Sequence, residues 1–86
     1  MTKKIPMGLV DLEFVEEMAV VLQNGIKHGR KANDWKNLKK NKVDEYRNKI
    51  LRHLLAFDRS RQLSTKLIHL ASIACDAMIL SSIIKK

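Results

Sequence analysis

The hydrophobic positions of the chain fall into three segments with helical spacing, and no segment alternates in the manner of a strand. Over residues 9–28, apolar residues recur at spacings of three and four, and Gly29 supplies a C-terminal stop. Residues 42–57 carry one apolar stripe and end in a short polar connection, which favours an antiparallel neighbour. Residues 64–84 are apolar nearly all round. The pattern predicts an all-α fold with three main helices over 9–28, 42–57 and 64–84.

The third predicted helix bears on the oligomeric state. A helix that is apolar on every side is buried on most sides, and three helices of this size cannot surround one of their own. We therefore expect a helical bundle completed by a homodimer through residues 64–84. The segment approaches the length of a short membrane span, but it contains His69 and Asp76. A central aspartate costs about 2.5–3.5 kcal/mol on insertion, so we expect no membrane association.

Length and composition narrow the class of protein. The 86 residues predict a single domain over 1–86, and the lone Cys75 excludes an intramolecular disulfide and a cysteine-based zinc site. Glutamates interrupt any apolar stretch near the N-terminus, so we expect a cytoplasmic protein without a signal peptide. The formal charge of +8 predicts an anionic partner, which is a nucleotide, a nucleic acid or an acidic protein surface. Walker A, G-x-G-x-x-G and nucleophile-elbow motifs are absent.

A line of polar residues inside the apolar third helix is the most informative feature. His69, Ser72 and Asp76 stand at positions i, i+3 and i+7 and therefore share one face. A buried carboxylate is unfavourable unless it has a cation, a metal, a proton or access to water. Arg52 and His53 on the second helix are the nearest candidate partners. The line is either a structural Asp76–Arg52 pair with a hydrogen-bonded core histidine at position 69, or part of a functional site.

An acidic cluster stands on the first helix. Glu13 precedes Glu16 by three residues and Glu17 by four, and like charges at these spacings repel each other. A divalent cation would turn this repulsion into coordination, since Mg²⁺ binds carboxylates together with substrate phosphates. The alternative is an ordinary solvated acidic face.

A basic region follows the first helix. Trp35 interrupts it, either as a plug for the core or as a surface on which a ligand stacks. The region offers charge for phosphate but no glycine-rich cradle, and the alternative is a solvated loop. Its basic residues are Lys27, His28, Arg30, Lys31, Lys36, Lys39, Lys40 and Lys42.

Three stretches together resemble a known family. They are FVEEMAVVLQNGIKHGRKANDW (residues 14–35), YRNKILRHLLAF (residues 46–57) and HLASIACDAMIL (residues 69–80). Their order is similar to the dATP/dGTP diphosphohydrolase N-terminal-like family, found largely in phages and allied to the all-α, MazG-like nucleotide pyrophosphohydrolases. The resemblance covers about residues 9–84. It implies a helical, usually dimeric fold. It also implies hydrolysis of a (deoxy)nucleoside triphosphate to the monophosphate and pyrophosphate.

The resemblance also implies a set of site residues. Acids on two helices would hold Mg²⁺ or Mn²⁺, which activates water and bridges the phosphates. Trp35 would lie beside the base, and the phosphates would meet Lys27, His28, Arg52 and His53. The implied metal ligands are Glu13, Glu16, Glu17 and Asp76, and the implied catalytic residues are Glu13, Glu17, Asp76 and His69.

The sequence departs from the family pattern at two places. An acidic stretch expected before the third helix reads Ser64, Thr65, Lys66, and the second histidine of the H-L-A-H element is Ser72. Either the chain uses a reduced metal set built on the glutamates and Asp76, or it has lost catalysis and kept the scaffold. In the second case we expect a phage protein that binds a nucleotide, a nucleic acid or a host defence protein.

Overall fold

A computed structural model describes residues 4–86, and within that range the chain is all-α, as the hydrophobic pattern predicts. No strand occurs among these residues. The boundaries of the three long helices differ from the predicted ones by at most three residues. The elements are η1 (Met7–Leu9), α1 (Leu12–Lys27), η2 (Asp34–Asn37), η3 (Lys40–Lys42), α2 (Val43–Arg59) and α3 (Leu63–Ile84), where η marks a short 3₁₀ helix.

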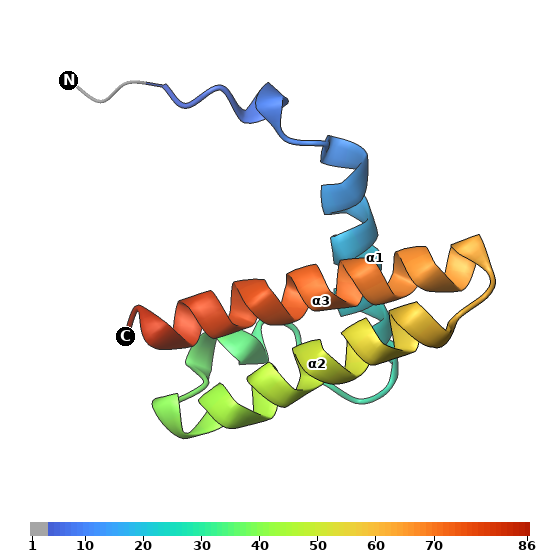
Figure 1. Cartoon of the computed structure of the whole chain (residues 1–86). Coiled ribbons are helices and arrows are strands. Elements are labelled where there is room, and N and C mark those ends of the chain that lie inside the picture. The colour runs from blue at the N-terminus through green and yellow to red at the C-terminus, as the bar shows by residue number, and fades with distance from the viewer. Residues whose placement is uncertain (1–3) are drawn as a thin grey trace.

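Helices α2 and α3 form an antiparallel hairpin and lie side by side along most of their length (Figure 1). The connection between them is short, and Lys66 on the first turn of α3 reaches back to α2. Its ammonium donates a 2.7 Å hydrogen bond to the carbonyl of Phe57 and lies 4.4 Å from the centre of the Phe57 ring. This carbonyl lies in the last turn of α2 and also accepts a 3.3 Å hydrogen bond from the backbone N–H of Ser60, so the lysine adds a second donor to a helix end.

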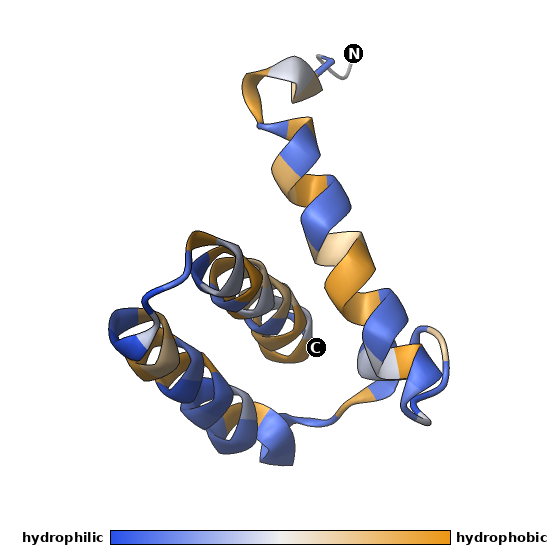
Figure 2. Cartoon of the chain, turned by 90° about the vertical axis from the view of Figure 1, so that its right-hand side faces the viewer, coloured by the Kyte–Doolittle hydropathy of each residue, from blue (hydrophilic) through white to orange (hydrophobic). Residues whose placement is uncertain are grey.

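Helix α1 crosses the hairpin instead of lying along it (Figures 1 and 2). Asp11 caps its N-terminus by accepting a 3.1 Å hydrogen bond from the backbone N–H of Glu13. Gly29 follows its C-terminus with a φ of 104°, a left-handed conformation that glycine adopts without steric strain. The contacts of α1 with α3 include a hydrogen bond from the Cys75 thiol to the carbonyl of Met18, with an S···O distance of 3.3 Å.

The core lies where the C-terminal half of α3 meets the start of α2. Tyr46, Ile79 and Ile83 are its buried centre, and Ile83 is completely inaccessible. Partly buried apolar side chains surround this centre and come from η2, the residue after it, α2 and α3. They are Trp35, Leu38, Val43, Met78 and Leu80.

Much of α3 stays exposed in the single chain. Its most apolar 18-residue window has a mean hydropathy of 1.9, and one third of that window is buried. Among the described residues α3 is the helix long and apolar enough to cross a membrane, a criterion that core helices of soluble proteins also meet. In the hydropathy view α3 is mostly orange, with a few hydrophilic segments along it (Figure 2).

Candidate functional site

A pocket of about 580 Å³ opens where α1, the loop after it, α2 and α3 come together. This volume lies within the range of about 300–1,000 Å³ that small-molecule sites occupy. Apolar side chains from α1 form one wall, and polar side chains from α2 and α3 form another. The polar and aromatic lining residues are Arg30, Lys31, Asn33, Asp34, Trp35, Tyr46, Lys49, Arg52, His53, His69, Ser72, Cys75 and Asp76.

The pocket has an excess of positive charge. Arg30 and Lys31 reach it from the loop, and Lys49 and Arg52 reach it from α2, against two acids, Asp34 and Asp76. None of the four cations forms an ion pair with a pocket acid within 4.0 Å, and the partner of Lys49 is Glu45, outside the pocket, at 3.9 Å. Clefts lined by charge of one sign attract ligands of the other sign. The arrangement therefore suits an anion.

Asp76 sits on the buried face of α3 with 9% of its surface exposed. Its Oδ2 atom lies 4.0 Å from Nε2 of His53, and this buried oxygen has no hydrogen-bond partner. Burial raises the pKa of the Asp76 carboxyl, while the positive charges of His53, Lys49, Arg30 and Arg52 act in the opposite direction. The expectation that the third helix carries a buried carboxylate agrees with the structure, and of the two candidate partners on α2 the nearer one is His53 rather than Arg52.

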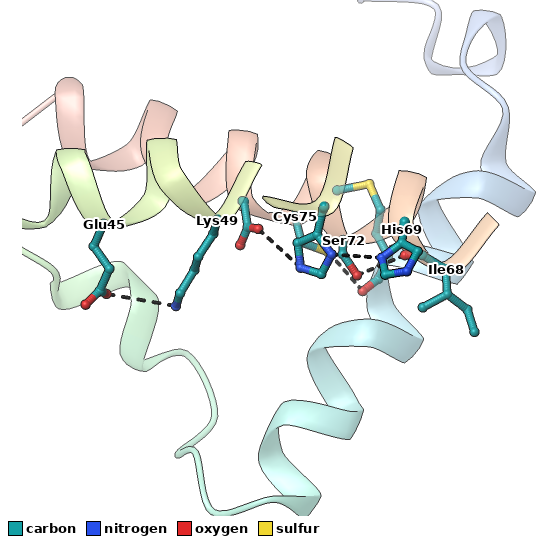
Figure 3. A network of polar contacts seen from close by, with 9 residues as sticks. Glu45, Lys49, Ile68, His69, Ser72 and Cys75 are labelled. Atoms are coloured by element: carbon teal, nitrogen blue, oxygen red, sulfur yellow. Dashed lines mark hydrogen bonds and ion pairs between the residues drawn. The ribbon is translucent and has the colours of Figure 1, made fainter. Parts of the chain in front are cut away.

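Two histidines extend the polar line from Asp76 toward the pocket. The Nδ1 atoms of His53 and His69 lie 3.0 Å apart, a distance at which one ring donates a hydrogen bond and the other accepts it. Burial lowers the pKa of His53, Asp76 opposes this shift, and His69, Arg52 and Lys49 reinforce it. Figure 3 draws this chain of contacts, with His69 at its end. Asp76, His53 and His69 therefore form one connected group.

Two further residues of α3 face the same region but have their polar groups occupied. The Ser72 hydroxyl donates a 2.9 Å hydrogen bond to the carbonyl of Ile68, one turn earlier (Figure 3). Burial raises the pKa of the Cys75 thiol to about 11, so it stays protonated at neutral pH. The prediction that Cys75 is an inert core residue agrees with its exposure of 2%.

Aromatic rings close the pocket beside the basic loop. Trp35 is half-buried, packs against the core centre and lines the pocket, so both of its alternative roles are compatible with its position. Tyr46 is buried under the Lys49 ammonium, which lies 4.3 Å from the centre of its ring. Burial raises the pKa of the Tyr46 hydroxyl. An indole and a phenol ring next to cations suit a ligand with both an aromatic part and an anionic part.

Several residues that the resemblance implied lie elsewhere. Glu13, Glu16 and Glu17 are exposed on α1, and Lys27 and His28 are exposed at its C-terminal end, all outside the pocket lining. Among residues 4–86, no three His, Cys, Asp or Glu side chains are grouped so that they could hold a metal ion. The implied metal set is thus not assembled within one chain, and Mg²⁺ or Mn²⁺ binding stays a prediction.

The sequence reasoning missed two pocket residues, Lys49 and Tyr46. Lys49, Arg52 and His53 stand at i, i+3 and i+4 on α2, so the spacing itself indicates one shared face. Tyr46 stands three residues before Lys49 on the same face, within the apolar stripe of residues 42–57.

The chain as a whole matches a family model. The model describes the dATP/dGTP diphosphohydrolase N-terminal domain and matches residues 1–86, so the chain belongs to this family. No curated protein and no solved structure matches the chain.

Proposed function

We propose that the pocket binds a purine (deoxy)nucleoside triphosphate. The observation that carries the proposal is the pocket itself, which places four cationic side chains next to Trp35 and Tyr46 in a volume of about 580 Å³. In this arrangement Arg30, Lys49 and Arg52 neutralise the phosphates, and the base stacks on Trp35. Membership in a family described as a dATP/dGTP diphosphohydrolase N-terminal domain supports the choice of a purine nucleotide.

The proposed activity is hydrolysis of the bound triphosphate. Water attacks the α-phosphorus, the bond to the bridging oxygen breaks, and pyrophosphate leaves. The polar group on α3 offers a path for the proton. If the Asp76 carboxylate accepts from Nε2 of His53, then Nδ1 of His53 accepts from His69, and Nε2 of His69 keeps a free lone pair for the water.

Phosphate neutralisation in this proposal rests on side-chain cations, because the α1 glutamates lie outside the pocket. A charge-assisted hydrogen bond from arginine to phosphate is short and about twice as strong as a neutral one. Where the pocket closes over the phosphates, the lower local dielectric strengthens these contacts further. No step of the proposal passes through a metal.

A substrate panel tests the activity. Pyrophosphate release is measured from deoxy- and ribonucleoside triphosphates with Mg²⁺ or Mn²⁺, and again with a chelator. We expect turnover of dATP and dGTP, and we expect Asp76→Asn to abolish it. The carboxylate only accepts hydrogen bonds and so favours the His53 tautomer with a proton on Nε2, whereas the amide can also donate and does not select this tautomer. Asp58→Asn makes the same change at an exposed position on α2 outside the pocket and should leave turnover unchanged. Equal turnover in the two variants would remove Asp76 from the mechanism.

The second candidate is a binding protein without turnover. The observation that favours it is the separation of the α1 glutamates from Asp76 within the chain. In that case the protein still binds nucleotides, nucleic acid or an acidic host protein through the basic pocket and loop. A panel without turnover, combined with binding that falls steeply with salt, would select this candidate.

A further inference from the structure

Two charged residues of the pocket, Lys31 and Asp34, take no part in the phosphate contacts or in the proton path. Lys31 lies in the loop after α1, and Asp34 is the first residue of η2. Both line the pocket, and neither forms an ion pair within 4.0 Å among residues 4–86. Asp34 directly precedes Trp35, on which the proposed base stacks. The wall beside the base therefore carries one acceptor group and one donor group that the proposed function has not used.

A tight turn holds these two residues next to each other. The backbone N–H of Asp34 donates a 3.3 Å hydrogen bond to the carbonyl of Lys31, which closes a β-turn over residues 31–34. Asn33 takes the third position of the turn with a φ of 63°, a left-handed conformation that asparagine tolerates. The whole turn lines the pocket together with Trp35. The turn thus brings a carboxylate, an ammonium and an indole to the same space.

The phosphate end of the pocket lies near Asp76, on the side of α2 and α3. Burial raises the pKa of Asp76, and nearby positive charges oppose this shift. Three of these charges neutralise the phosphates in the proposed function, and Lys31 is not among them. The base then lies toward the turn at residues 31–34. The charges that act on Asp76 are those of His53, Lys49, Arg30 and Arg52.

Guanine and adenine present different hydrogen-bonding groups to such a wall. Guanine donates from N1–H and from its 2-amino group and accepts at O6, whereas adenine accepts at N1 and donates from its 6-amino group. An ionised carboxylate only accepts hydrogen bonds, and a lysine ammonium only donates them. Guanine therefore finds a partner in both Asp34 and Lys31. Adenine in the same position sets an acceptor against the carboxylate and a donor against the ammonium.

We propose that Asp34 and Lys31 make the pocket selective for guanine nucleotides over adenine nucleotides. Asp34 accepts from N1–H and the 2-amino group, Lys31 donates to O6, and the ring stacks on Trp35. The inference rests on the proposed function, because it needs the triphosphate in the pocket with its base at Trp35. It goes further than the family description, which names dATP and dGTP together.

Calorimetric titration with analogues of three nucleotides tests the selectivity. An imido group replaces the oxygen between the α- and β-phosphates of each analogue, so the proposed cleavage does not occur. We expect the dGTP analogue to bind at least about tenfold more tightly than the dATP analogue, since a hydrogen bond to a charged group contributes about that factor. The dITP analogue lacks the 2-amino group but keeps N1–H and O6, so its affinity should lie between the other two.

Matched variants test the two residues. Asp34→Asn replaces the carboxylate by an amide, which donates as well as accepts, so the ratio of the dATP and dGTP dissociation constants should fall toward one. Lys31→Gln should lower the ratio for the same reason. Asp58→Asn and Lys39→Gln make the same changes at exposed positions outside the pocket and should keep the wild-type ratio. The ratio is the readout because a change in net charge alters the binding of every triphosphate alike.

The outcomes separate this inference from the proposed function. Equal affinity of the wild type for the dGTP and dATP analogues would overturn the selectivity and leave nucleotide binding in place. An unchanged ratio in Asp34→Asn would also overturn it, and Asp34 would then be a solvated acid of the loop. If none of the three analogues bound, the proposed function would fail together with this inference.

Discussion

The inner and outer faces of α3 have similar hydropathy but opposite environments. On the inner face, Ser72 and Asp76 are buried polar residues among Ala71, Cys75 and Ile79. On the outer face, uncharged leucine, alanine, serine and isoleucine residues face solvent. The comparison teaches that a helix apolar all round can serve two purposes. One face builds a polar site within the chain, and the other face is exposed to a second chain in the homodimer that we expect from the sequence.

Neighbouring isoleucines give the largest expected difference between the two faces. Ile83 is fully buried in the core centre, and Ile84 is 62% exposed on the outer face. Ile83→Ala should lower the free energy of unfolding by about 2–4 kcal/mol, because it leaves a cavity among Tyr46 and Ile79. Ile84→Ala should change the stability of the isolated chain by less than about 0.5 kcal/mol. Urea unfolding measures both values in an Ala77→Glu background, in which a charge at an exposed position of α3 should keep the chains monomeric.

Equal losses in the two isoleucine variants would contradict the division of α3 into a core face and a free face. In the expected homodimer, Ile84→Ala should become more costly, and its effect should then depend on protein concentration.

The histidine pair gives a smaller, pH-dependent effect on the inner face. Burial lowers the pKa of His53, so the free protein holds this ring neutral at pH 7. Bound phosphates favour the protonated ring and raise its pKa, so below neutral pH binding takes up a proton and tightens, whereas the proposed proton path through His69 uses the neutral ring. The gain is at most about tenfold per pH unit and levels off below the pKa of free His53.

Dissociation constants for dATP between pH 5.5 and 8 check this prediction. His53→Gln keeps a hydrogen-bonding side chain and should flatten the profile. His28→Gln, at an exposed position outside the pocket, should leave the profile as it is. A wild-type affinity that is constant over this range would mean that His53 does not sense the phosphates.

The helices and the buried acid could be predicted from the sequence because both follow from local rules. Helical spacing fixed the three segments, and a charge within an apolar helix indicated a polar site. The contact of Asp76 with His53 instead of Arg52 depends on how α2 is rotated against α3, and neighbouring residues on one helix do not reveal this. The outward direction of Glu13 and Glu17 depends on how α1 crosses α3, which spacing along α1 does not encode.

The most direct test of the account is the binding of dATP to two arginine variants. Arg52 lines the pocket, and Arg61 is an exposed cation outside it, so Arg52→Gln and Arg61→Gln change net charge equally. Calorimetric titration should show affinity reduced about tenfold or more for Arg52→Gln, since a hydrogen bond to a charged group contributes about 1.5–3 kcal/mol. Arg61→Gln should bind as the wild type does. Equal affinities for the two variants would contradict the claim that this pocket binds the nucleotide.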